Sequence, residues 1–216
     1  RLVGSEMCIR DSLIMGHFPM KDKAGYYNFA KAFTEININV SKWKTQDMVA
    51  KRQIEDGDNT HEGWVMINDL VSKGYKYQAA CQLATLKPDR LTARQVANGD
   101  ESEFFVNIEY GKRIHKALTD RFGEGDDKTI KTKEFTKEIV LSIQKLTNRQ
   151  GIGWATGIME KFINSLSDKD VADIKNAKST KVQRKDEKRK QILDKAFSYF
   201  LGQENIKSVS YTHLRA

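Results

Sequence analysis

The chain has 216 residues, of which 37 are Lys or Arg and 29 are Asp or Glu, giving a formal net charge of +8. This length fits one domain, or one domain and part of a second. No apolar run approaches the about 20 residues that a membrane-spanning helix needs, so the sequence excludes such a helix and predicts no membrane partner.

Both ends of the chain resemble translated adapter DNA. Residues 1–12 and 209–216 match, in frame, the two strands of a transposase-type sequencing adapter. Such segments are set aside before the fold is considered, as expression tags are. We therefore expect an internal fragment of metagenomic origin, at about residues 13–207, whose own ends lie outside the sequence.

The remaining sequence has 34 basic and 27 acidic residues, because the flanks hold three arginines and two acidic residues. Its single cysteine, Cys81, cannot form an internal disulfide, which favours a reducing compartment. We therefore expect a cytoplasmic protein, encoded by a cell or by a phage. His17, His61 and His115 lack the spacing of metal ligands, so we predict no metal site.

Apolar residues at helical spacing predict a mainly α-helical multi-helix bundle. The first part differs, because residues 36–41 alternate between apolar and polar side chains, as a short strand does. We interpret 13–42 as the remnant of a truncated α/β domain, followed by a helical domain over 43–122 and a C-terminal helical region over 128–207. Predicted helices cover about 46–55, 61–73, 77–86, 93–98, 109–122, 133–146, 154–166 and 180–201, and a further helix begins at 168.

Two of these helices have the pattern of a helix-turn-helix pair. Gly74 is the turn glycine of that motif, and its apolar positions before and after the turn are filled by Leu70, Tyr75, Ala80 and Leu83. This would leave Lys76, Gln78 and Gln82 facing outward, where lysine binds phosphate or guanine and glutamine binds adenine. An ordinary pair of core helices fits the same pattern and stays open as the alternative.

The excess positive charge is concentrated between residues 175 and 195. Nine basic residues lie there against three acidic ones, a net charge of +6. A local cluster of this kind is typical of contact with a polyanion, although a solvated helix face is the alternative. The residues expected to bind phosphates are Lys181, Arg184, Lys185, Lys188, Arg189 and Lys190.

No motif for catalysis or cofactor binding is present. The sequence lacks a Walker loop, a dinucleotide-binding glycine motif, a zinc-protease motif and a nucleophile elbow. Glu101 with Glu103, and Asp168 with Asp170, form carboxylate pairs that helix capping and surface charge explain more simply. We predict no cofactor and leave enzymatic activity open.

The segment after residue 36 resembles ParB-like proteins of the ParB/sulfiredoxin fold, which occur in phages and plasmids. The residues that carry the resemblance are Asn39, Lys42, Trp43, Thr45, Asp47, Gly57, Asn59 and Trp64. Lys44 interrupts the usual Trp-Thr pair, and Trp64 stands where tyrosine is more common. The resemblance implies an N-terminal α/β domain and a helical DNA-binding part. The family's Gly-x-His-Arg motif would lie before Leu13.

We therefore expect a DNA-binding protein of plasmid-partition or phage-regulatory type, with DNA as its partner and a homodimer as an open question. One alternative is a helical protein-interaction module, in which the face with Ile192, Phe197 and Leu201 contacts a partner. Another is a fragment of an enzyme whose catalytic part is missing.

Overall fold

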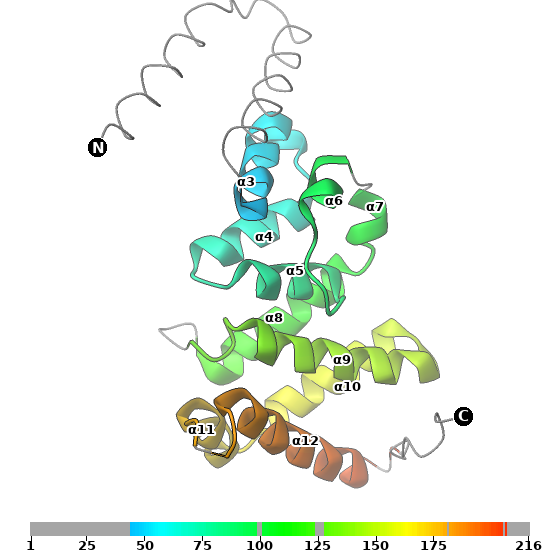
Figure 1. The fold of residues 1–216 in the computed structure, drawn as a ribbon. Coiled ribbons are helices and arrows are strands. Elements are labelled where there is room, and N and C mark those ends of the chain that lie inside the picture. Colours follow the sequence, from blue (N-terminus) through cyan, green and yellow to red (C-terminus); the bar gives the residue numbers. More distant parts are fainter. Residues whose placement is uncertain (1–43, 99–100, 124–127, 181, 205, 207–216) are drawn as a thin grey trace, which may run out of the picture.

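A computed structural model describes residues 44–98, 101–123, 128–180, 182–204 and 206. The expected strand at 36–41 and the expected α/β remnant lie outside these ranges. The described residues form a mainly helical fold without strands, as predicted (Figure 1). The elements are α3 (Thr45–Asp56), η1 (Gly57–Asn59), α4 (Glu62–Ser72), α5 (Tyr77–Thr85), α6 (Ala93–Asn98), α7 (Glu101–Phe104), α8 (Ile108–Phe122), α9 (Lys133–Gln150), α10 (Ile152–Ser165), α11 (Asp168–Asn176) and α12 (Lys185–Gln203).

The helix starts follow local capping chemistry. Ser167 and Asp170 form a reciprocal capping box at the start of α11. Helix α4 begins at Glu62, one residue after the predicted start, because His61 caps it: His61 Nδ1 accepts from the Gly63 amide at 3.0 Å. The start of α12 also differs. It begins at Lys185 instead of Thr180, because the Thr180 side chain bonds Gln183 in a turn before the helix.

Helix α5 lies at the centre of the fold. Each of its residues from Ala79 to Thr85 is buried. It packs against α4, α8 and α9, and Figure 1 shows it between α4 and the α8–α9 pair. Helices from before and after residues 124–127 therefore share one core, since α5 packs on α9 and α8 packs on α10.

Small residues allow this central packing. Ala79, Ala80 and Ala84 have short side chains, so neighbouring helices can approach the backbone of α5 closely. Gly111 of α8 lies directly on the backbone of α5, where a Cβ atom at position 111 would be 2.0 Å from the carbonyl oxygen of Leu83. Because the obstacle is backbone, a larger residue would force the two helices apart.

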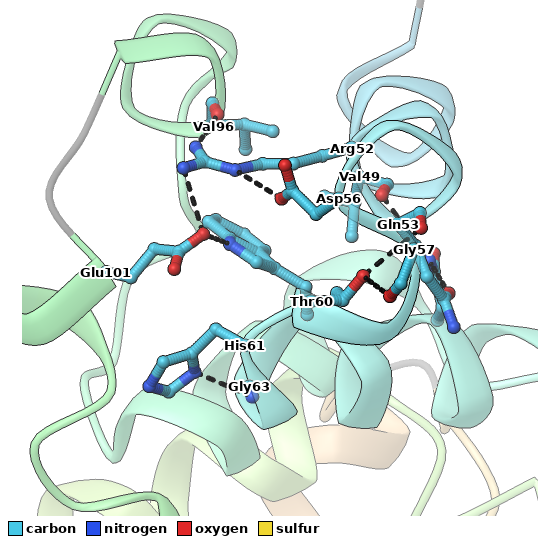
Figure 2. A network of polar contacts seen from close by, with 12 residues as sticks. Val49, Arg52, Gln53, Asp56, Gly57, Thr60, His61, Gly63, Val96 and Glu101 are labelled. Atoms are coloured by element: carbon cyan, nitrogen blue, oxygen red, sulfur yellow. Dashed lines mark hydrogen bonds and ion pairs between the residues drawn. The ribbon is translucent and has the colours of Figure 1, made fainter. Parts of the chain in front are cut away.

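A polar network joins α3 to the α6–α7 segment (Figure 2) and includes the indole N–H of the buried Trp64. The Arg52 guanidinium donates to the Val96 carbonyl at 2.7 Å and pairs with Glu101 at 2.9 Å. Glu101 also accepts from the Trp64 indole N–H at 2.6 Å. The network satisfies the polar atom of a fully buried aromatic residue, and so holds the N-terminal helices on the core.

Two glycines in helix interiors test the close contact between α5 and α8. We expect Gly111→Ala to lower the free energy of unfolding by about 2 kcal/mol or more, because the added methyl group meets the Leu83 carbonyl. Gly157→Ala in α10 is the control, since a Cβ there meets nothing within 4 Å. That control should gain up to about 1 kcal/mol from helix propensity. Urea denaturation measures both. Equal effects of the two substitutions would contradict the contact.

Candidate nucleic-acid interface

The turn between α4 and α5 has the local form that the sequence predicts. Gly74 adopts a positive φ of 88°, which a residue with a side chain rarely adopts. The four larger inward positions, Leu70, Tyr75, Ala80 and Leu83, are all buried. The local helix-turn-helix pattern is thus present, but its second helix is the central helix of the core.

Gln82 does not face outward, so this part of the prediction is wrong. Its side chain is fully buried. Its amide donates to the Pro88 carbonyl at 2.7 Å, and its carbonyl oxygen accepts from the Thr136 hydroxyl of α9. The physical reason is that α9 covers the face of α5 that would enter a DNA groove. Most of α5 therefore cannot contact bases.

The start of α5 remains accessible. Lys76 is exposed and Gln78 is half-buried. The Lys76 amide donates to the Lys131 carbonyl at 3.0 Å, which places the α4–α5 turn beside the residues that precede α9. Lys131 in turn lies with Nζ 5.9 Å from the centre of the Tyr75 ring.

Two residues of the predicted basic helix bind to other parts of the chain. Arg189 is only 3% exposed and donates to the Thr129 hydroxyl at 2.8 Å and to the Ile174 carbonyl at 3.1 Å. Its prediction as a phosphate ligand is wrong, because its guanidinium joins α11 and α12 to the segment that precedes α9. Lys190 is half-buried and pairs with Glu138. Burial alone would lower the pKa of Lys190, but its hydrogen bond to Glu138 raises that pKa overall.

The other basic residues of this segment stay near the surface. Arg184 is exposed, and Lys185 and Lys188 are half-buried in the first turn of α12. Lys181 lies outside the described residues. The exposed Asp186 and Glu187 stand between Lys185 and Lys188, so the first turn of α12 carries both signs of charge.

Three connections bring basic residues to one side of the molecule. The α4–α5 turn, the residues before α9 and the start of α12 lie along the same side in Figure 1. Hydrogen bonds join them in sequence, from the Lys76 amide to Lys131 and from Arg189 to Thr129. We call this surface the basic edge, and it consists of Lys73, Lys76, Lys128, Lys131, Arg184, Lys185 and Lys188.

The sequence prediction missed the middle of the basic edge. Lys128 and Lys131 stand in the short segment Lys128-Thr-Ile-Lys131-Thr-Lys133, which was not among the predicted sites. Its signal was the presence of three lysines within six residues just before a helix. Only the fold shows that this segment lies between the two basic segments that were predicted.

The basic edge has the chemistry of a phosphate-binding surface. Lysine ammonium groups bind phosphate oxygens without reading sequence. Tyr75, the aromatic residue beside Lys131, is only 6% exposed, so it offers no platform on which a single-stranded base could stack. Asp69 reduces the positive charge locally, because it pairs with Lys73 at 2.9 Å.

The carboxylate pairs noted in the sequence have structural roles. Glu101 bonds Trp64 and Arg52, and Asp170 caps α11. The Cys81 thiol is buried in α5, and burial raises its pKa, which disfavours the reactive thiolate. Within the described ranges, no cluster of three or more metal-ligating side chains occurs. The same ranges contain no helix with the length and apolar character to cross a membrane.

Comparison of the chain with protein-family models, with curated proteins and with solved structures gave no match of any of the three kinds.

Two glutamines of α5 test where the surface of this helix lies. We expect Gln82→Ala to lower the free energy of unfolding by about 2 kcal/mol, because it removes two buried hydrogen bonds and leaves a cavity. Gln78→Ala, in the half-exposed first turn of the same helix, should stay within about 0.5 kcal/mol. Thermal or urea denaturation measures both variants. If Gln82→Ala were as stable as Gln78→Ala, position 82 would be at the surface.

Proposed function

We propose that this chain binds double-stranded DNA through phosphate contacts on the basic edge. The observation that carries the proposal is the meeting of basic residues from three connections far apart in sequence, around Lys76, Lys128 and Lys185. Charge gathered on one side is a better predictor of a polyanion partner than the same charge spread over the surface. A duplex is favoured over a single strand because the described edge lacks an exposed aromatic side chain.

This mode of binding differs from that of a helix-turn-helix protein. Such a protein places its second helix in the major groove and reads base edges with outward side chains. Here that helix is buried from Ala79 to Thr85, so only Lys76 and Gln78 at its start are near the surface. The proposed contacts therefore supply affinity for phosphates and little preference for sequence.

The ParB-like resemblance would extend this proposal to DNA of a plasmid-partition or phage-regulatory system. Four of the residues that carry the resemblance have structural roles that do not require DNA. Thr45 begins α3, Asp47 accepts from the Lys44 amide at 3.1 Å, Gly57 ends α3 and Trp64 is fully buried. Support for the extension therefore comes from the sequence resemblance, whereas support for DNA binding comes from the basic edge.

Salt dependence tests the proposed DNA contacts. In the triple variant Lys76→Ala/Lys128→Ala/Lys185→Ala, we expect a shallower plot of the logarithm of the binding constant against the logarithm of salt concentration. The slope should fall by about 0.9 for each phosphate contact that is lost, or about 2.7 in total. Fluorescence anisotropy with a labelled duplex measures the slope.

The control for this experiment removes the same charge elsewhere. Arg94 of α6 and Lys145 and Arg149 near the end of α9 are exposed. Their combined replacement by Ala should leave most of the slope unchanged. An equal loss in both triple variants would mean that only net charge matters. A wild-type chain that binds no duplex even at low salt would refute the proposed function.

A further inference from the structure

A buried arginine is bonded to the middle of the basic edge. Arg189 of α12 is almost fully buried among the segments packed around it. Its Nε donates to the Ile174 carbonyl of α11 at 3.1 Å, and a terminal nitrogen donates to the Thr129 hydroxyl at 2.8 Å. Asp186 lies 3.6 Å from the other terminal nitrogen. Arg189 therefore connects α11 and α12 to the segment that precedes α9.

The segment that Arg189 holds carries the middle of the basic edge. Thr129 and Ile130 are only 2% and 1% exposed. The lysines on either side, Lys128 and Lys131, keep part of their surface accessible. These residues form a turn rather than a helix, so their positions depend on contacts with the rest of the fold. One of those contacts is the hydrogen bond from Arg189 to the Thr129 side chain, which lies between the two lysines.

We propose that Arg189 is a positioning residue of the DNA-binding surface. Its bond to Thr129 holds Lys128 and Lys131 at the surface, between the other two basic connections. A lysine side chain is flexible, so binding a phosphate costs less free energy when the backbone that carries the lysine is already fixed. Arg189 then strengthens DNA binding without contacting DNA. This role rests on the proposed function, because it concerns how the same surface is held in place.

The substitution Arg189→Lys separates positioning from charge. Lysine keeps the positive charge, but its compact ammonium group lacks the planar fork that reaches both Ile174 and Thr129. We expect the salt dependence of duplex binding to become shallower by up to about 1.8, which is about 0.9 for each contact of Lys128 and Lys131. Binding at 0.1 M salt should weaken about tenfold or more. Fluorescence anisotropy with a labelled duplex measures both changes.

Substitutions of Thr129 test whether Arg189 acts through this residue. Thr129→Val removes the hydroxyl that accepts from the guanidinium, and it should flatten the salt dependence as Arg189→Lys does. Thr129→Ser keeps the hydroxyl and should restore the slope. The double variant Arg189→Lys/Thr129→Val should lose no more than either single variant, because both substitutions break the same contact. Additive losses would overturn the proposed route through Thr129.

The matched control is the same substitution in the other arginine network. Arg52 bonds the Val96 carbonyl and pairs with Glu101, and so joins α3 to the α6–α7 segment. None of these helices contributes a residue to the basic edge. Arg52→Lys should therefore leave the slope unchanged, although it also breaks internal contacts. An equal loss of slope in Arg52→Lys and Arg189→Lys would mean general destabilisation and would overturn the positioning role.

Failure of the positioning role differs from failure of the proposed function. If the wild type binds the duplex and Arg189→Lys keeps its full slope, only the positioning role is refuted. A wild type that binds no duplex refutes the proposed function itself. Hydrogen–deuterium exchange without DNA adds a second readout. Amides 128–132 should exchange faster in Arg189→Lys than in the wild type, and unchanged exchange there would also overturn the role.

Discussion

The contact between α5 and α8 at Gly111 is the constraint on which the rest of the fold depends. There the α8 backbone meets the Leu83 carbonyl with no room for a side chain. This close approach lets α4, α8 and α9 surround α5, which becomes a helix with almost no surface of its own. The buried hydrogen bond between Gln82 and Thr136 then joins α5 to α9. Because polar groups inside a core must be paired, this bond also fixes how the two helices face each other.

The burial of α5 decides where any partner can bind. Since the central helix is covered, α5 offers a partner little more than its first turn, and the exposed basic groups lie on the connections and on the other helices. Packing also decides the role of Arg189. This residue belongs to the most basic segment of the sequence, but it is buried and holds α12 to α11 and to Thr129. Arg184, Lys185 and Lys188, in contrast, keep part of their surface accessible to solvent. The location of the proposed DNA-binding surface therefore follows from what the core leaves uncovered.

The sequence predicted the helical class and most helix positions, because apolar spacing and capping residues act locally. It also predicted the inward positions Leu70, Tyr75, Ala80 and Leu83, which fit a helix pair in either a DNA-binding protein or a core. It could not tell which face of α5 is covered, since that depends on α9, more than 50 residues later in the chain. For the same reason the prediction placed Gln82 and Arg189 at the surface and missed Lys128 and Lys131.

Hydrogen–deuterium exchange with and without a DNA duplex would test the central claim most directly. In the free chain, amides from Ala79 to Thr85 should be among the slowest to exchange, because α5 opens only when the core opens. Added duplex should protect residues 73–76, 128–132 and 184–188 and leave the already slow α5 amides unchanged. Fast exchange along α5 in the free chain, with protection of that helix by DNA, would contradict the account and identify α5 as a recognition helix.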